Sequence, residues 1–592
     1  MLALHHIQLQ VGNPQSPQTL LRDVSLNIPA GQLVGIVGPA GSGKSTLIKV
    51  IAGVHEPTEG NVQWAGRDLA QEDLAPYDIG YVPQFSIAFD HLTVWESMLD
   101  ALRLRVVGLS QQERYFRAKS ILEQVGIMSI SGRRVAVLSG GEKRRLGLAL
   151  ELATFPSLLI ADEVTSGLDP KSEQEIMRLM YDLTRGVDRI VLAVTHNLRH
   201  IALCDSVIVM HQGSMVYHGT TPGLLEYFQV ESAEDVFPKL AKKLPQEWHE
   251  AWAERRGDFE LPPAPETEEI VPRQASLLPS APVQPPLAPS GPEPETEGEP
   301  QPTRNQTTTP GFFTQFFVLM ERRWRIFFRD KSQVYLHLAL LLGFPCLVVI
   351  FALGGLPQIQ NLSMTSDVNV IQQLREANAF TIQSAKIGQL VSGLVIMQVV
   401  LLTLMGSNNS AREIAGERLI FEKEKLGGLR PLSYLASKAT FLSVLVALQS
   451  FWMAVFVSFV CHIPGDLMDQ VLLLFLANAA MTATCLAISS MMKSPEQASL
   501  VSIYLVGFQL PLSGAVLGLP EFFRWLTRPF ISAYWSWSGI LQTLQETRYY
   551  EIVKSVTPTD LSLGALCIWA LGCHVCIGLI ISYLGCIRSR WE

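Results

Sequence analysis

The sequence has little charge and few cysteines for its length of 592 residues. Asp, Glu, Lys and Arg make up only 17%, hydrophobic residues make up 48%, and the mean hydropathy is +0.23. This composition is too apolar for an ordinary soluble protein but too diluted for a chain made only of membrane helices. Eight cysteines exclude a disulfide scaffold, and all of them except Cys204 lie in or beside apolar runs, which favours packing roles.

An excess of basic residues is also missing. The chain has 54 acidic and 46 basic residues and a net charge of −8, which excludes a protein-wide nucleic-acid surface, so no nucleic-acid partner is expected. The start, MLALHHIQLQ, lacks the basic segment and apolar run of a cleavable secretory signal. The N-terminal half is therefore expected to stay in the cytosol.

The length predicts more than one domain. Residues 1–230 alternate short β-rich runs with longer helical stretches, which predicts an α/β domain with a mostly parallel sheet. Residues 231–256 are assigned to a helical extension of that domain. Residues 257–310 are rich in Pro, Glu, Gln, Thr and Ser and cannot form a core, so they are predicted to be a disordered linker.

The apolar residues gather after the linker. Residues 311–332 place aromatic side chains on one side and Gln315, Arg322, Arg325 and Arg329 on the other, which predicts an amphipathic helix lying on a membrane surface. Residues 333–592 contain apolar runs near the ~20 residues that span a bilayer. They predict an all-α six-helix transmembrane domain with spans at about 334–354, 386–406, 439–461, 470–492, 498–518 and 561–584.

Lys and Arg are more frequent in the segments that this topology places in the cytosol. We therefore expect an integral membrane protein in a lipid bilayer, with both termini and residues 1–230 cytoplasmic. Polar residues inside the spans, Gln398, Gln449, Asn478 and Gln509, either line a substrate path or hydrogen-bond between helices. An otherwise apolar path suits a small lipid-like or amphipathic substrate.

A glycine-rich loop follows the apolar run LVGIV and opens an apolar helix, which is the context of a phosphate-binding loop. Its glycines let backbone N–H groups converge on phosphates, Lys44 reaches the β and γ phosphates, and the Ser45 hydroxyl is placed to ligate Mg²⁺. The predicted ATP-binding residues are Gly38, Pro39, Ala40, Gly41, Ser42, Gly43, Lys44, Ser45 and Thr46.

Two carboxylates end the apolar run LLIAD further along the chain. Asp162 is predicted to hold Mg²⁺, and Glu163, the next residue, is predicted to polarise the attacking water as a general base. The sequence LSGGE contributes Ser139, Gly140, Gly141 and Glu142 at the start of a helical run. Such a helix N-terminus suits a γ-phosphate, although a simple helix cap has the same pattern.

Three further short motifs complete a family pattern. Gln84 in YVPQ, Asp169 in TSGLDP and His196 in VTHN stand in the order and spacing of the ABC-transporter ATPase motifs. Residues 1–230 therefore resemble an ABC nucleotide-binding domain. The resemblance implies an α/β P-loop ATPase fold of ABC type with a helical subdomain, and ATP and Mg²⁺ as cofactors.

The same resemblance implies several residue roles. Gln84 senses Mg²⁺ and couples to the membrane part, His196 contacts the γ-phosphate, and Asp169 bridges two ATPase domains. Ser139, Gly140, Gly141 and Glu142 complete the ATP site of the partner subunit. The chain departs from the family in having Val164 after the acid pair, and in having no aromatic residue between Met1 and Val37, where the family often stacks adenine.

The order of the domains, ATPase first and six spans second, resembles the half-transporters of the G subfamily, which include lipid, sterol and multidrug exporters. The resemblance implies a dimer, because one chain supplies one ATPase and six spans. A homodimer is favoured, because all site residues are intact and two copies would contain two competent ATP sites. Residues 412–425 carry Glu413, Glu417 and Glu424 and end at Gly427 and Gly428. Composition alone favours a solvated helix, whereas the resemblance implies a coupling helix.

Two functions stay open at this point. The first is an ATP hydrolase that drives export of a lipid-like or amphipathic substrate. The second is a membrane ABC ATPase that drives or regulates an envelope partner without transporting a substrate itself. An importer is less expected, because the sequence encodes no substrate-binding domain.

Overall fold

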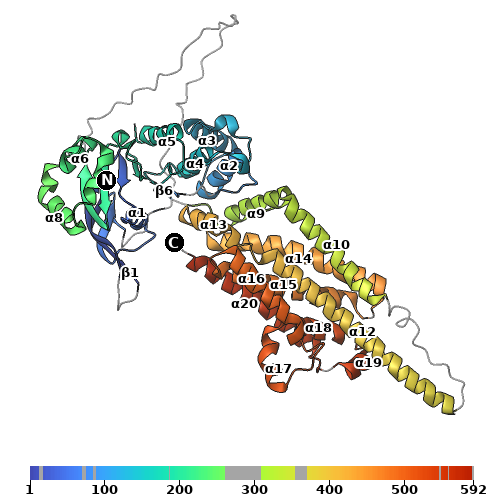
Figure 1. Cartoon of the computed structure of the whole chain (residues 1–592). Helices are drawn as coiled ribbons and strands as arrows, with labels where there is room; N and C mark the ends of the chain where they lie inside the picture. The colour runs from blue at the N-terminus through green and yellow to red at the C-terminus, as the bar shows by residue number, and fades with distance from the viewer. Residues whose placement is uncertain are drawn as a thin grey trace, which may run out of the picture. The chain divides into compact units, whose positions relative to one another are not determined.

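The computed structural model describes residues 1–12, 18–69, 75, 77–84, 88–185, 187–259, 309–353, 370–463, 465–545, 549–557 and 559–589, and side chains between 370 and 383 only at 382. The predicted linker lies almost wholly outside them. Contacts divide the chain into two compact units (Figure 1). Unit 1 comprises Met1–Ile87, Ser97–Arg133 and Val137–Thr309, and unit 2 comprises Ala88–Glu96, Arg134–Ala136 and Pro310–Glu592.

Unit 1 contains two sheets. An antiparallel sheet has the order β2-β1-β4-β5, and a larger sheet has the order β10-β9-β3-β8-β7-β6, parallel except for the β9–β10 pair. The strands are β1 (Leu2–Val11), β2 (Gln18–Ile28), β3 (Leu33–Val37), β4 (Glu59–Trp64), β5 (Arg67–Asp68), β6 (Ile79–Val82), β7 (Leu158–Asp162), β8 (Ile190–Val194), β9 (Ser206–His211) and β10 (Ser214–Gly219). Strands β3, β7 and β8 are fully buried, as expected of parallel strands covered on both faces.

The helices of this part of the chain are α1 (Lys44–Ile51), α2 (Val94–Arg105), α3 (Gln111–Gln124), α4 (Gly140–Glu151), α5 (Pro170–Asp182), α6 (Thr221–Phe228), α7 (Val236–Leu240) and α8 (Pro245–Arg255). Helix α2 begins in unit 2 and continues into unit 1. The α/β P-loop fold predicted for residues 1–230 is confirmed. Within the predicted helical extension, Trp248 and Trp252 are buried, and Trp252 packs 5.4 Å from Tyr217 of β10, measured between ring centroids.

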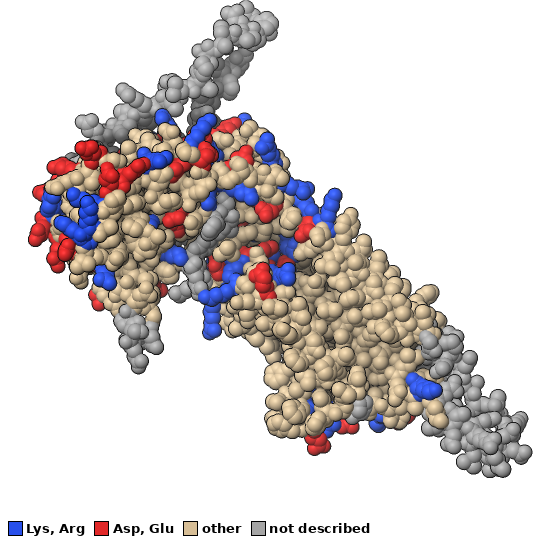
Figure 2. Space-filling model, viewed as in Figure 1, with Lys and Arg blue, Asp and Glu red and all other residues tan. Residues whose placement is uncertain are grey.

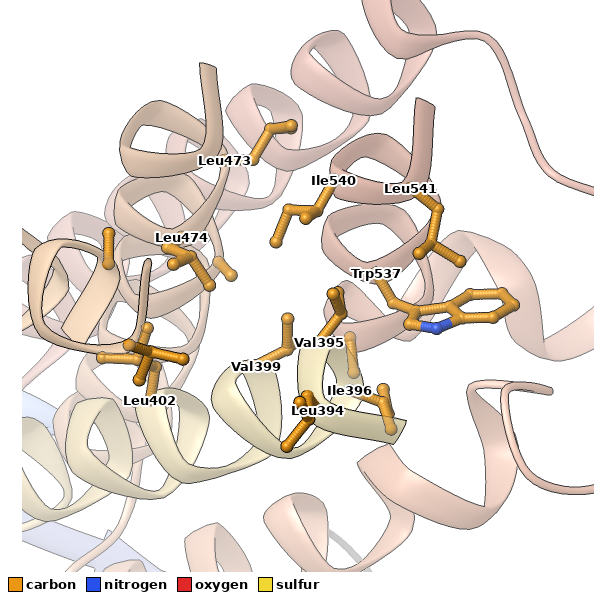
Figure 3. Packing of buried hydrophobic residues seen from close by; sticks show 14 of the residues in the cluster. Leu394, Val395, Ile396, Val399, Leu402, Leu473, Leu474, Trp537, Ile540 and Leu541 are labelled. Atoms are coloured by element: carbon orange, nitrogen blue, oxygen red, sulfur yellow. The ribbon is translucent and has the colours of Figure 1, made fainter. Parts of the chain in front are cut away.

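Unit 2 is helical. Its helices are α9 (Phe312–Arg329), α10 (Lys331–Ala352), α12 (Val370–Ser410), α13 (Arg418–Leu426), α14 (Pro431–Cys461), α15 (Leu467–Met491), α16 (Pro495–Leu512), α17 (Glu521–Thr527), α18 (Ser532–Gln542), α19 (Tyr549–Val556) and α20 (Gly564–Arg588). A hydrophobic cluster among its described residues brings together side chains of several helices, including α12, α15 and α18. Figure 3 shows Val399 and Leu402 of α12, Leu474 of α15, and Trp537 and Ile540 of α18 in this cluster.

Five helices in the described part of the chain are long and apolar enough to cross a membrane: α10, the segment Ser384–Leu426, α14, α15 and α20. The predicted span at 498–518 overlaps α16, which begins with Pro495, Glu496 and Gln497, ends at Leu512 instead of 518, and is not among the five. Figure 2 shows a broad face of unit 2 without Lys, Arg, Asp or Glu and with charged side chains toward its ends. The apolar helices make this an integral membrane protein.

The polar residues of the spans mostly hydrogen-bond within unit 2. Asn409 Nδ2 donates to Gln449 Oε1 at 2.9 Å, and Asn478 Nδ2 donates to the same oxygen at 3.2 Å, so α12, α14 and α15 share one buried amide cluster. Gln509 Oε1 accepts from Ser532 Oγ and from the Ala533 N–H, at the start of α18. Of the two open interpretations, hydrogen bonding between helices holds for Gln449, Asn478 and Gln509.

Helix α9 exposes Phe313 and Phe317, in agreement with the predicted aromatic face, but two of the four polar residues predicted on the opposite face are not solvated. Gln315 and Arg322 are buried: Gln315 Nε2 donates to Gly428 O at 3.0 Å, and Arg322 forms a two-bond ion pair with Glu424. A charged face can be buried when each charge has a partner. The partners come from a segment about a hundred residues away, which local periodicity does not reveal.

Close packing of α12 on α15 depends on Gly406. A methyl group added there would lie 2.7 Å from Asn478 Oδ1 and 2.8 Å from the Asn478 carbonyl oxygen, and the carbonyl cannot move away cheaply. Gly393, on the same helix, has no atom within 4 Å of an added methyl. We expect Gly406→Ala to lower stability by about 1–3 kcal/mol through overpacking, and Gly393→Ala to have little effect. Thermal melting of the two purified variants, followed by size-exclusion chromatography, checks this; equal midpoints would contradict it.

Candidate functional site

The phosphate-binding loop joins β3 to α1. At Gly38 a methyl group would lie 2.3 Å from the Met210 carbonyl oxygen, and Gly43, at the N-cap of α1, has φ +96°, so both positions require glycine. The Lys44 Nζ is buried and donates to the carbonyl oxygens of Gly38 and Pro39, both at 2.9 Å. The loop therefore curls around one ammonium group.

This loop fits a phosphate group. The Ser42 hydroxyl is buried and has no hydrogen-bond partner among the described residues, and a glycine-rich loop of this kind lets backbone N–H groups converge on a phosphate. Burial is the main cause that holds the pKa of Lys44 below its usual value, while Glu163 and Asp162 act in the opposite direction. The charges at this site are thus close enough to influence one another.

Asp162 ends β7 and faces the start of α1. Ser45 Oγ donates to Asp162 Oδ1 at 3.3 Å, and Tyr81 Oη donates to Asp162 Oδ2 at 3.1 Å. Burial raises the pKa of Asp162, and the hydrogen bond from Tyr81 is the strongest influence that lowers it. A hydroxyl beside a carboxylate is a donor set that Mg²⁺ prefers, so Ser45 and Asp162 would hold the ion.

Glu163 has a strained backbone. Its φ is +46°, a left-handed conformation that is uncommon outside glycine and that recurs at active sites. Its N–H donates to the Val194 carbonyl at 3.1 Å, and its Oε2 accepts from Gln84 Nε2 at 2.9 Å. The structure thus brings Gln84 and the two acids together at the ends of β6 and β7.

His196 follows β8 and its side chain is exposed. The parallel register pairs Asp162 with Val194, two residues before His196, so His196 lies at the same sheet edge as the acid pair. No hydrogen bond joins its ring to another described residue. Its predicted contact with the γ-phosphate stays a prediction.

The LSGGE segment forms the start of α4. Ser139 is the N-cap: the Glu142 N–H donates to Ser139 Oγ at 3.3 Å, and the Ser139 N–H donates to Glu142 Oε2 at 2.7 Å. This reciprocal pair is a capping box. Ser139 and Gly140 are exposed, so the cap and the predicted role toward a partner's ATP are compatible.

Asp169 caps α5. Its carboxylate accepts from the Ser172 N–H at 3.0 Å and from Ser172 Oγ at 2.6 Å, and the hydroxyl bond holds the pKa of Asp169 below its usual value. A methyl group added at Gly141 would lie 3.6 Å from that Ser172 Oγ, so the starts of α4 and α5 are neighbours. The bridging role of Asp169 stays a prediction.

Sequence reasoning missed two residues that support the site. Tyr81 lies on β6, three residues before Gln84. Its hydroxyl, on an otherwise apolar strand, was the sequence signal that could have identified it. Arg105 forms a buried ion pair with Glu151, 2.9 Å between the nearest atoms, and so ties the end of α2 to the end of α4. Charged residues at two helix ends carry no signal of mutual contact in the sequence.

The fold and these residues define a P-loop ATPase joined to membrane helices. The family model described as ABC transporter matches residues 21–166, and the model described as ABC-2 type transporter matches residues 314–535. The chain is 31% identical over 249 residues to the methionine import ATP-binding protein MetN 2 of Enterococcus faecalis, covering 41% of this chain and 72% of that protein. The chain belongs to the ABC transporter family, and the predicted half-transporter order is confirmed.

Two further similarities were found. The ABC transporter ATP-binding/permease protein Rv1747 of Mycobacterium tuberculosis is 28% identical over 591 residues, which cover 97% of this chain. This chain spans 61% of the length of that relative. The solved ATP-binding cassette MJ0796, a dimer bound to ADP and Pi, shares 29% identity and a TM-score of 0.34 over 37% of this chain and 98% of that one.

Proposed function

We propose that this chain is one half of an ATP-driven exporter that works as a homodimer and moves a lipid-like or amphipathic substrate. The observation that carries the proposal is the presence, in one chain, of the assembled ATP site and an ABC-2 type membrane domain. One chain has one phosphate loop and one LSGGE helix. Because Ser139 and Gly140 are exposed at the start of α4, they are available to a second copy.

An apolar substrate is favoured by the interior of unit 2. The described hydrophobic cluster that joins its apolar helices is large, and the buried amides of Asn409, Gln449 and Asn478 bond to one another. The methionine in the names of the MetN relatives does not indicate the substrate of this chain, because the match to MetN 2 covers only 41% of it.

We propose six crossings: the five candidate spans and, between α15 and α20, α16. Glu424 of α13 pairs with Arg322, in the helix before the first span, and Lys425 of α13 donates to the Cys586 and Ile587 carbonyls at the end of α20. The first span therefore starts, and the last one ends, at the same end of unit 2. This placement supports an even number of crossings, and the basic residues at that end favour the cytoplasmic side.

Purified chains in liposomes test the transport proposal. We expect ATP-dependent movement of at least one probe from a panel of fluorescent phospholipids and amphipathic dyes, and no movement by Glu163→Gln. ATPase activity that responds to no probe and needs an added envelope protein would instead support the non-transporting alternative.

Mixed subunits test the dimer and the LSGGE assignment. Lys44→Ala and Ser139→Arg should each remove hydrolysis in a homodimer. Co-expressed with different tags and purified through both, the two variants place both lesions in one composite site and leave the other intact. We expect partial ATPase activity to return, up to about half of the wild-type rate if the sites act independently. If the doubly tagged complex is as inactive as each parent, then either the ATP sites are not shared between subunits or one intact site is not enough for hydrolysis.

We further propose that Glu413, Glu417 and Glu424 couple ATP hydrolysis to transport. Helix α13 and the turn before it contact the ends of several helices: Glu424 pairs with Arg322 of α9, Glu417 with Lys438 of α14 at 2.6 Å, and Arg418 donates to Ser490 O of α15 at 2.5 Å. A shift of α13 would change its contacts with all of these helices. An element with many partners is suited to transmit a conformational change.

The segment after the Gln84 loop supports this proposal. Residues 88–96 belong by their contacts to unit 2, where Glu96 forms two hydrogen bonds with Arg329 at 2.6 and 2.7 Å. The guanidinium carbon of Arg322 lies 4.6 Å from the Phe89 ring centroid. Arg322 therefore contacts both this segment and Glu424 of α13.

Removing one charge from α13 tests the coupling. Glu424→Gln keeps the shape but weakens the pair with Arg322, so we expect ATP hydrolysis to remain while the number of probe molecules moved per ATP falls several-fold. Glu521→Gln, which loses an exposed pair with Arg524, is the control. An unchanged ratio in a properly assembled Glu424→Gln dimer would remove this contact from the mechanism.

A further inference from the structure

Tyr81 lies where strand register directs it toward the acid pair. It is 5% exposed and pairs with Ile160 across the parallel β6–β7 ladder. Side chains alternate between the faces of a sheet, so Tyr81, Ile160 and Asp162 share one face. The long phenol side chain reaches forward along this face, and its hydroxyl donates to Asp162 Oδ2 at 3.1 Å.

The two oxygens of Asp162 are held from two directions. Ser45 of α1 donates to Oδ1 and Tyr81 of β6 donates to Oδ2. Three residues after Tyr81, Gln84 donates to Glu163. The end of β6 thus holds both acids at the end of β7, one by a phenol and one by an amide.

We propose that Tyr81 is a positioning residue for the Mg²⁺ site. This inference rests on the assignment of Ser45 and Asp162 to the metal. The Tyr81 hydrogen bond fixes the rotation of the carboxylate, so that Oδ1 stays beside the Ser45 hydroxyl. Without it, the buried Oδ2 loses this donor and the carboxylate gains freedom to turn. Partners of metal ligands typically contribute to metal affinity in this way.

Nucleotide binding provides a readout other than activity. The affinity of the purified full chain for the non-hydrolysable analogue AMP-PNP is measured with saturating Mg²⁺ and with EDTA, and the ratio of the two affinities gives the gain due to the metal. We expect Tyr81→Phe to reduce this gain about tenfold and to leave the affinity in EDTA unchanged.

Tyr217→Phe is the matched control. Tyr217 is fully buried, and its hydroxyl donates to Thr220 O at 2.7 Å. It lies on β10, at the opposite edge of the same sheet from β6. This variant loses one buried tyrosine hydrogen bond without touching the acids. Its stability should fall, and its metal-dependent gain should stay at the wild-type value.

The Asp162→Asn variant distinguishes the positioning role of Tyr81 from the assignment of Asp162 to the metal. A wild-type gain in Tyr81→Phe combined with a reduced gain in Asp162→Asn would overturn the positioning role. A wild-type gain in Asp162→Asn would overturn the metal assignment itself, and the inference with it. An equal loss of affinity with and without Mg²⁺ in Tyr81→Phe, or a raised gain, would show that Tyr81 does not support metal binding.

Discussion

Replacing Glu163 with Gln is expected to lower ATP hydrolysis by about 10²-fold or more, the usual effect of losing a general base, while ATP still binds. The amide keeps the shape of the carboxylate and removes its ability to accept a proton. The phosphate loop, Lys44 and the Ser45–Asp162 pair are unchanged in this variant, so a nucleotide-bound dimer should accumulate. Phosphate release and the elution volume with ATP and Mg²⁺ measure the two effects.

Glu123→Gln is a suitable control, because Glu123 forms an exposed pair with Lys119 on α3, 3.8 Å between the charged atoms. It should hydrolyse ATP at the wild-type rate. Normal turnover by Glu163→Gln would place the base elsewhere. Loss of ATP binding in that variant would instead assign Glu163, held by Gln84 and strained at φ +46°, to the architecture of the site.

The phosphate loop could be predicted from sequence because its signal is local. A strand, three glycines, a lysine and a helix follow one another within nineteen residues, from Leu33 to Ile51. Gly41 and Gly43 have positive φ, which favours glycine, and Lys44 bonds to carbonyls five and six residues before it. The order of residues along the chain was therefore enough to predict this part of the site.

Tyr81 and the buried arginines of α9 could not be found in this way. The contact of Tyr81 with Asp162 spans 81 residues and depends on which residues of β6 and β7 pair. Arg322 was placed on the polar face of an amphipathic helix, yet its partner Glu424 lies 102 residues away, and the neighbouring Arg323 pairs with Glu413, 90 residues away. Periodicity distinguishes two faces of a helix, but it does not tell whether a charged face meets water or a distant carboxylate.

The segment at 412–425 shows the same limit. Its dense charge, taken alone, favoured a solvated helix, whereas in the structure Glu413, Glu422 and Lys423 are all buried. The turn at Gly427 and Gly428 ends α13 as predicted, because a glycine with φ +91° at Gly428 stops a helix. The local backbone signal correctly predicted the end of this helix, whereas the sequence did not predict that its charged side chains are buried.

Replacing Glu413 with Leu is expected to cause a large loss of stability in unit 2. The Glu413 carboxylate accepts from Arg323 Nε at 2.6 Å and from Lys438 Nζ at 2.9 Å, and all three side chains are less than a tenth exposed. Glu413→Leu removes the carboxylate and leaves Arg323 buried without this partner. Breaking such a pair costs about 3–5 kcal/mol.

The double variant Glu413→Leu with Arg323→Leu makes the test specific. It removes both members of the pair, and Lys438 keeps its bond to Glu417 at 2.6 Å. We therefore expect the double variant to be more stable than either single variant, because no unpaired charge remains from the Arg323–Glu413 pair. Glu521, which forms an exposed ion pair with Arg524, gives the reference. Glu521→Ala should lower the free energy of unfolding by less than about 1 kcal/mol.

Denaturant titration of the detergent-purified chains, followed by tryptophan fluorescence, ranks these variants. The expected order of stability is wild type and Glu521→Ala together, then the double variant, then the two single variants. If the double variant loses as much as the sum of the two single losses, the two side chains contribute independently. In that case the buried network would not act as a unit, and its use as a coupling element would lose its physical basis.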